Sequence, residues 1–191
     1  AIADIMPLVG ENRIIARFGL GQLKHSRNPG LKALIEAAGL AGDTIDSDHV
    51  GFALGPRLNA CGRMDHARNA AELFTTATTA HAAAIAKNLC TLNDQRRATE
   101  QRIAEHAVKM AEDAGMTGSE RRAIVLAHPE WHAGVIGIVC SRLIDRFHRP
   151  TILLQLKDGH AHGSGRSVEG FSLHAALERC SHHLLTFGGH D

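Results

Sequence analysis

The feature that most constrains the fold is a stretch from Thr79 to Ala114 that contains neither glycine nor proline. Its apolar residues fall near one stripe at helical spacing, with charged residues between and opposite them. These apolar residues are Ile85, Leu89, Leu92, Ile103 and Met110. The stretch predicts a long amphipathic helix that ends at Gly115. A coiled-coil dimer is the alternative, but the heptad is not sustained over the roughly four repeats that a coiled coil requires.

The segments on both sides of this helix predict an α/β fold with two α/β lobes joined by the helix. Before it, AIADIMPLV reads as an emerging strand, and SRNPGLKALIEAAGL reads as a helix capped by Ser26 or Asn28. After it, RAIVLA, PTILLQL and HAHGSGRS predict strands that alternate with apolar helices. We expect three parts, 1–80, 81–115 and 116–191. Both lobes are expected to be incomplete, because the chain lacks an initial Met and stops just after a glycine-rich turn.

Composition narrows the functional classes. The 21 Lys and Arg residues are balanced by 20 Asp and Glu residues, so binding to an anionic partner must depend on local features. The four cysteines form no CxxC pair, which argues against a zinc ribbon and fits a reducing compartment. With neither a signal-peptide pattern nor an apolar run of about 18 residues, a cytoplasmic location is expected. The absence of GxxxxGK[ST] weighs against a nucleoside triphosphatase.

Two candidate sites lie in the first half of the chain. Asp4 follows a short apolar run, where a carboxylate can bind a hard divalent cation, although a helix cap or surface aspartate is the alternative. In LGPRLNACGR, Arg57 and Arg63 lie on either side of Asn59, and neighbouring glycines permit close backbone approach. The two guanidinium groups can clamp a phosphate, but a glycine-kinked turn with solvated arginines explains the same pattern.

A third candidate is HPEWHAGVIGIV. His132 is expected near the N-terminus of a helix, where its imidazole and free backbone N–H groups can meet an anion. Pro129 breaks the helix between His128 and His132, which excludes the zinc-protease pattern. Trp131 either stacks on a base or packs in the core, and core packing is the favoured interpretation.

Two glycine-rich turns near the end of the chain, in GSGRS and FGGH, are suited to cradling a phosphate or a terminal nucleotide. The candidate residues in these turns are Ser164, Arg166, Ser167, Gly188, Gly189 and His190. No Ser/His/Asp set is suggested by the spacing, so nucleophilic catalysis by serine or cysteine finds no support.

Six stretches together resemble the RecJ family of single-strand-specific DNA exonucleases, within the DHH phosphoesterase superfamily. They occur in the family's order and spacing: AIADIMPLVGENRIIARFGLGQL, RNPGLKALIEAAGL, FALGPRLNACGRM, HPEWHAGVIGIVCSRLIDRFHRPTILL, GSGRSVEGFSLHAAL and FGGH. The resemblance implies hydrolysis of single-stranded DNA from its 5′ end with Mn²⁺ or Mg²⁺, in DNA repair and recombination.

The same resemblance implies roles for particular residues. Asp4 becomes a catalytic metal ligand, and the remaining ligands are expected upstream of residue 1, so the chain alone is expected to be inactive. The phosphate-binding residues implied are Arg57, Arg63, Ser164, Arg166 and His190. A repair helicase or a single-strand-binding protein is the expected protein partner. A nucleic-acid-binding or nucleotide-binding scaffold of the same superfamily, without hydrolysis, is the alternative.

Overall fold

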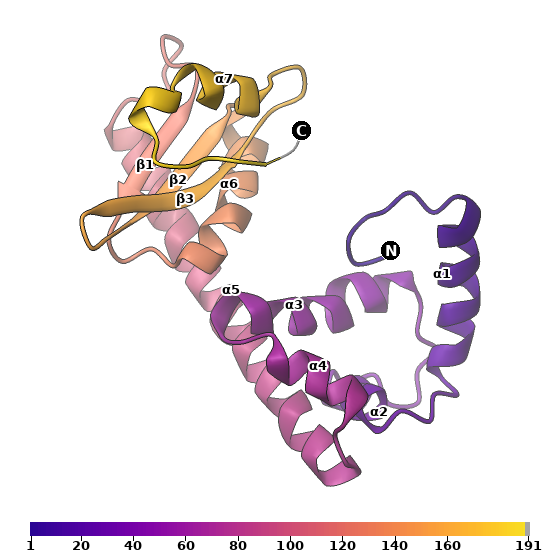
Figure 1. Cartoon of the computed structure of the whole chain (residues 1–191). Helices are drawn as coiled ribbons and strands as arrows, with labels where there is room; N and C mark the ends of the chain where they lie inside the picture. The colour runs from indigo at the N-terminus through magenta and orange to yellow at the C-terminus, as the bar shows by residue number, and fades with distance from the viewer. Residues whose placement is uncertain (190–191) are drawn as a thin grey trace. The chain divides into compact units, whose positions relative to one another are not determined.

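A computed structural model describes residues 1–189 and confirms the α/β class, with seven α-helices and a mixed three-stranded sheet in that range (Figure 1). The chain divides into two compact units, Ala1–Arg97 and Ala98–Asp191. The long helix α5, Thr79–Asp113, contributes residues to both units. Among the described residues, none of the helices combines the length and apolar character of a membrane span. The division into 1–80, 81–115 and 116–191 stays a prediction.

The first unit is helical throughout its described residues. Its elements are α1 (Gly10–Leu23), α2 (Pro29–Ala37), the π-helix η1 (His49–Leu54), α3 (Gly55–Met64), α4 (Arg68–Thr75) and the first part of α5. The strand expected near residue 1 is absent, because residues 2–5 form a turn with Ile5 at a φ of 53°. A strand needs a neighbour to pair its peptide groups, and Pro7 removes one donor from this segment. The expectation of a strand here was wrong.

Local sequence signals explain α2 well. Asn28 is its N-cap, and the side chain accepts a hydrogen bond from the Leu31 N–H at 3.0 Å. Gly39, just beyond the end, has a φ of 77°. Gly30 lies so close to α4 that a Cβ there would be 1.8 Å from the Leu73 carbonyl oxygen. The core of this unit then forms between α2, α3, α4 and α5, around Leu34, Ile45, Leu54, Leu73, Leu89 and Leu92.

The second unit is built on a sheet in the order β1-β2-β3. β1 (Ile124–His128) pairs in parallel with β2 (Thr151–Lys157), and α6 (Ala133–Phe147) connects them, as the strand–helix–strand pattern predicts. β2 pairs antiparallel with β3 (His160–Arg166) through a two-residue turn, Asp158 and Gly159, both with positive φ. α7 (Leu173–Arg179) and the 3-10 turn η2 (Ser181–His183) follow.

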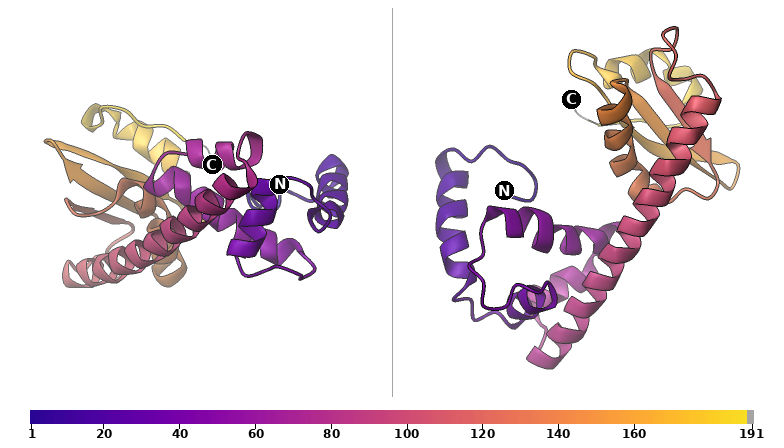
Figure 2. Two further views of the ribbon diagram at one scale, coloured as in Figure 1. Left: turned by 90° about the horizontal axis from the view of Figure 1, so that it is seen from below. Right: turned by 180° about the vertical axis from the view of Figure 1, so that it is seen from behind.

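Helix packing completes the core of the second unit. The last part of α5 lies beside the sheet, which is clearest in the right-hand view of Figure 2. Trp131 is 1% exposed, and its indole N–H donates to Nδ1 of His106 on α5 at 3.3 Å, so the core role predicted for this tryptophan is confirmed. Arg142 of α6 forms an ion pair with the buried Glu100 of α5 at 2.5 Å. These contacts hold α5 and α6 together beneath the sheet.

Candidate nucleic-acid interface

Asp4 lies in the turn at the start of the first unit. The turn closes through two backbone bonds, Met6 N–H to the Ala1 carbonyl at 3.0 Å and Ile5 N–H to the Ile2 carbonyl at 3.1 Å. The neighbouring residue Ala3 packs on Gly55, where a Cβ would lie 3.0 Å from the Ala3 methyl group. Gly55 is therefore a point of close approach that holds the exposed Asp4 turn against the start of α3.

Asp4 by itself does not make a metal centre. A divalent cation with oxygen ligands takes several donors at once. Within residues 1–189 no cluster of three or more His, Cys, Asp or Glu side chains could hold a metal ion. The described residues therefore do not fit a complete Mn²⁺ or Mg²⁺ site, and Asp4 can supply at most one ligand to a site completed by other residues.

The arginines of α3 occupy different environments. Arg57 is half-buried, and its guanidinium donates to the Ala53 carbonyl in η1 at 2.7 Å and to Sγ of Cys90 on α5 at 3.2 Å. Asn59 and Arg63 are exposed farther along the same helix. Gly62 has only an ordinary neighbour, because a Cβ there would lie 3.8 Å from that of Ala67. Arg57 thus ties three elements together, a role that the sequence motif did not reveal.

His132 is the N-cap of α6, at the position that the sequence predicted. Its Nδ1 accepts from the Gly134 N–H at 3.2 Å, and its carbonyl accepts from the N–H groups of Val135 and Ile136. These bonds use several of the backbone donors that the sequence analysis left for an anion. Because Nδ1 is an acceptor here, a neutral His132 carries its proton on Nε2, which is left to donate to a ligand.

Ser164 and Arg166 lie on the face of β3 that is turned toward α6. A Cβ on Gly137 would lie 3.2 Å from the Ser164 hydroxyl oxygen and 3.6 Å from Nη2 of Arg166. Gly137 is therefore a second close approach, within the first two turns of α6. Among the described residues, the Arg166 guanidinium makes one hydrogen bond, from Nη1 to the carbonyl of the adjacent Gly165 at 2.8 Å, and its side chain is exposed. A hydroxyl and a guanidinium thus lie together beside the N-terminal half of α6.

Cys140, one helical turn after Gly137, takes part in the same contact. Its Sγ donates to the Ser164 carbonyl at 3.2 Å. Burial raises the pKa of the Cys140 thiol to about 11, while a backbone hydrogen bond and the nearby charge of Arg166 act in the opposite direction. The thiol is neutral at physiological pH and serves to hold α6 on β3. Sequence reasoning missed this group, although Gly137 in an apolar helix was a signal of close approach.

The glycines of GSGRS have a packing role on the opposite face of β3. A Cβ on Gly163 would lie 2.0 Å from the Leu153 carbonyl oxygen, and one on Gly165 would lie 2.6 Å from a methyl group of Leu173 on α7. Ser167 Oγ donates to the Phe171 carbonyl at 2.5 Å and closes the turn before α7. The exposed Gly188 and Gly189 make no contact of this kind. His190 lies outside the described residues, and phosphate binding at all these positions stays a prediction.

Known proteins share much of this sequence. Residues 120–191 match the family described as the DHHA1 domain. Over 99% of its length the chain is 40% identical to the single-stranded-DNA-specific exonuclease RecJ of Bacillus subtilis (strain 168), covering 24% of that relative. It is 37% identical to RecJ of Escherichia coli (strain K12), covering 34% of it. The chain therefore spans about a quarter to a third of the curated relatives that it matches.

Solved structures of RecJ proteins are also similar to this chain. The crystal structure of RecJ from Thermus thermophilus in complex with Mg²⁺ superposes with a TM-score of 0.86 at 35% identity, covering 99% of this chain and 29% of that one. A crystal structure of exonuclease RecJ bound to manganese gives a TM-score of 0.81 at 35% identity, covering 98% of this chain and 46% of that one.

Proposed function

We propose that this chain, which is related to RecJ along its whole length, is part of a metal-dependent 5′-to-3′ single-stranded-DNA exonuclease that acts in DNA repair and recombination. Relatives at 35–40% identity are named single-stranded-DNA-specific exonucleases, which supports the proposal. The non-hydrolytic scaffold is not favoured, because the similarity extends over 99% of the chain and includes proteins solved with Mg²⁺ and Mn²⁺.

The observation that carries the proposal is the placement of Ser164 and Arg166 beside Gly137. The Arg166 guanidinium is planar and permanently charged, so it can hold two oxygens of one phosphate. Ser164 adds a hydroxyl that lies, like Nη2 of Arg166, beside Gly137 of α6. The helix dipole of α6 favours negative charge at its N-terminal end. We assign the phosphate of a strand terminus to this position, with Nε2–H of His132 as a further donor and Ser167 shaping the turn.

In the first unit, we assign Asp4 as one ligand of the divalent metal. When bound, Mn²⁺ or Mg²⁺ would supply an activated water and neutralise phosphate charge. The other ligands would have to come from outside the described residues. Asn59 and Arg63 are exposed on α3 and are assigned to the DNA backbone. Arg57 holds α3 against its neighbours in the structure. We assign it a phosphate contact because it belongs to the same motif as Asn59 and Arg63.

The proposed activity also indicates a class of protein partner and a cellular compartment. Nucleases that act on single strands need a strand to be opened or kept open, so a repair helicase or a single-strand-binding protein is the partner class we assign. The four cysteines are all free, which agrees with a cytoplasmic, reducing compartment. Gly188, Gly189 and His190 are assigned to the phosphate of the same terminus.

Substitution of Arg166 in the intact protein tests whether Ser164 and Arg166 bind the phosphate of a strand terminus. Arg166→Ala should weaken binding of a 5′-phosphorylated single strand by about 1.5–3 kcal/mol, the range for a hydrogen bond to a charged group. Arg166→Lys should restore part of the affinity, because it keeps the charge and loses the planar fork. Arg179→Ala, an exposed arginine on α7 of the same unit, is the matched control and should bind normally. Equal affinity of the Arg166 and Arg179 variants would refute the assignment.

Substitution of Asp4 separates hydrolysis from binding. In the intact protein, Asp4→Ala should abolish release of 5′ nucleotides while single-strand affinity in the absence of metal stays the same. Asp65→Ala, an exposed carboxylate in the same unit, is the control. Normal turnover of Asp4→Ala at saturating Mn²⁺ would show that Asp4 is no ligand. An intact wild-type protein that binds single strands without cleaving them would instead favour the scaffold.

A further inference from the structure

A second cationic surface lies on the first unit, outside all of the motifs considered above. Between Glu11 and Glu36 the chain has no Asp or Glu, although cations and anions are almost balanced overall at 21 and 20. The cationic residues in this interval are Arg13, Arg17, Lys24, Arg27 and Lys32. They cover α1, the connection after it and the first turn of α2. A concentration of one charge in a neutral chain requires a local explanation.

Helical geometry puts three of these cations in one row. At 3.6 residues per turn, Arg13 and Arg17 of α1 and Lys24, the C-cap just past its end, fall within an arc of about 40°. The exposed apolar side chains of α1, Ile14 and Phe18 among them, fall on a separate arc. A partner that covered the apolar side of α1 would therefore leave the cationic row accessible. We name this surface, formed by Arg13, Arg17, Lys24 and Arg27, the α1 cationic row.

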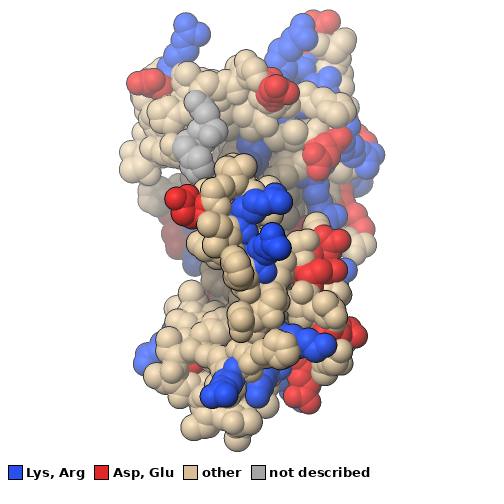
Figure 3. Space-filling view, turned by 90° about the vertical axis from the view of Figure 1, so that its right-hand side faces the viewer, with Lys and Arg blue, Asp and Glu red and all other residues tan. Residues whose placement is uncertain are grey.

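The side chains of the row are exposed. Among the described residues, none of the four takes part in an ion pair or a side-chain hydrogen bond, in contrast to Arg57, Arg142 and Arg146. Figure 3 views the molecule from the side of α1, and blue Lys and Arg side chains run down the centre of that view and gather at its lower end. Unpaired cations in a row are the footprint of a polyanion backbone.

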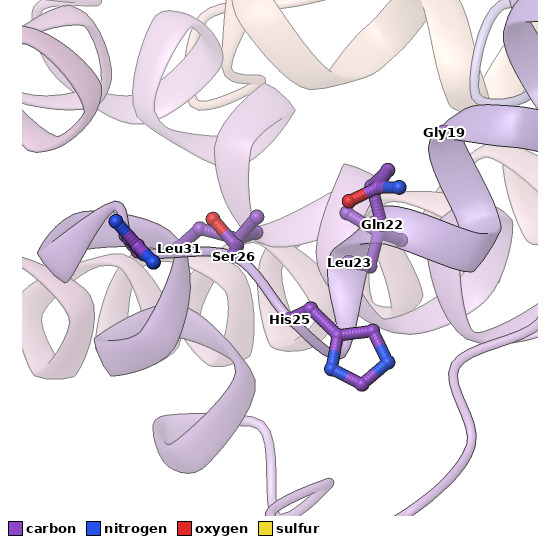
Figure 4. Close-up of a pocket in the computed structure, with 7 residues that line it drawn as sticks. Gly19, Gln22, Leu23, His25, Ser26 and Leu31 are labelled. Carbon is purple, nitrogen blue, oxygen red and sulfur yellow. The ribbon is translucent and has the colours of Figure 1, made fainter.

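The row ends at a hollow between α1 and α2. It is an open depression of about 440 Å³, lined by Gly19, Gln22, Leu23, His25, Ser26, Arg27 and Leu31. Figure 4 shows Gln22, Ser26 and His25 among the side chains that line it. The lining combines donors for a phosphate with the apolar surface of leucines, on which a sugar or base can rest.

We propose that the α1 cationic row and the hollow at its end form a second contact surface for the backbone of single-stranded nucleic acid, made of residues other than those assigned to the strand terminus. The ligand class is taken from the proposed function, so this inference rests on it. The row supplies salt-dependent, sequence-independent affinity, and the hollow takes one nucleotide of the strand. An anionic membrane would also attract cations beside an apolar helix face, and the experiment below distinguishes the two.

The test removes the charge of the row in the intact protein with the quadruple variant Arg13→Gln, Arg17→Gln, Lys24→Gln and Arg27→Gln. Binding of a long fluorescent single strand is measured without metal over a range of salt concentrations. Each lost phosphate contact should reduce the slope of log K against log [salt] by about 0.7, so the slope should fall by up to about 3. Affinity at low salt should fall about tenfold or more.

The matched control removes the same charge elsewhere, with Arg97→Gln, Arg102→Gln, Arg122→Gln and Lys157→Gln, all exposed. It should leave the slope close to that of the wild type. Double replacement Arg13→Lys and Arg17→Lys keeps the charge and should also keep the slope, which separates loss of charge from damage to α1. Circular dichroism establishes that each variant is folded.

Two results would overturn the inference. The first is a folded quadruple variant whose strand affinity and salt slope equal those of the control variant. The second is unchanged strand binding together with lost binding to vesicles of phosphatidylserine and phosphatidylcholine, which would assign the row to a membrane. Because binding is read without metal, failure of the proposed exonuclease activity would appear in the hydrolysis assay and would leave this measurement interpretable.

Discussion

The two arginine-bearing glycine motifs differ in how the protein uses their arginines. Arg57 in GPRLNACGR is half-buried and bonds to Ala53 and Cys90, 33 residues away in the chain. Arg166 in GSGRS is exposed on an edge strand and bonds only to the carbonyl of the adjacent Gly165 among the interactions of the described residues. Similar sequence signals thus produced a structural brace in one unit and an available cation in the other.

Each motif holds a glycine at a close contact, Gly55 in the first and Gly163 in the second, but not every glycine is required in this way. Gly163 is required by the close approach of Leu153, whereas a methyl group at Gly62 would meet only an ordinary contact. Glycine beside arginine is therefore no proof of a phosphate cradle. What separates the motifs is whether the side-chain donors are used by the fold, and each of the following experiments tests that difference.

The largest effect is expected at Gly163. Gly163→Ala would place a Cβ 2.0 Å from the Leu153 carbonyl oxygen, so β2 and β3 would have to separate. We expect the second unit to lose more than about 3 kcal/mol of unfolding free energy, as backbone clashes of this kind do. Trp131 is the single tryptophan of the chain and lies in this unit, so its fluorescence in a denaturant titration reports the loss. A change below about 0.5 kcal/mol would contradict the packing role.

The next effect is expected at Arg57. Arg57→Ala removes a charged donor from the Ala53 carbonyl and from Cys90, which should cost the first unit about 2–3 kcal/mol. Trp131 does not report this unit, so the loss should appear as faster amide hydrogen exchange in α3 and the first part of α5. Arg166→Ala should change the stability of its own unit by less than about 0.5 kcal/mol. Equal losses of unfolding free energy in the Arg57 and Arg166 variants would show that the two arginines do not differ in structural role.

A smaller effect follows from the thiol that holds α6 on β3. The pKa of Cys140 is raised from 9.0 to about 11 in the folded protein, mainly by burial. The folded state therefore holds this proton more tightly than the unfolded state, so the contribution is complete below pH 9 and is lost as pH rises toward 11. Unfolding free energy should fall by about 2 kcal/mol over that interval. Cys140→Ala should not show this fall in unfolding free energy. Identical pH profiles of stability for the variant and the wild type would contradict the role of the thiol.

The smallest effect is expected at Gly62. This glycine is exposed near the end of α3, and a Cβ there would lie 3.8 Å from that of Ala67. Gly62→Ala should stabilise the first unit by about 0.5 kcal/mol, because alanine lowers the backbone entropy lost in a helix. Hydrogen exchange of α3 is the measurement. Destabilisation would show that Gly62 has a close neighbour after all, as Gly163 does.

Several features of this protein were determined by the sequence itself, because they depend on near neighbours. Asn28 caps α2 through a bond to Leu31, three residues on, and His132 caps α6 through Gly134, two residues on. The absence of Gly and Pro from its 35 residues lets α5 run without a break. In the same way, Asp158 and Gly159 are a turn sequence that allows only a short hairpin between β2 and β3. Interactions of this range form wherever the local chain permits them.

The tertiary structure decided the rest. Arg57 has a structural role because its guanidinium donates to Cys90. Gly163 has a packing role because the Leu153 carbonyl leaves no room for a Cβ. The turn that replaced the expected strand at Asp4 packs on Gly55, far along the chain. Cys90 and Gly55 lie far along the chain from their partners, and Leu153 meets Gly163 only once β2 and β3 have paired. No local pattern of charge or hydrophobicity specifies which residue fills the space beside a side chain.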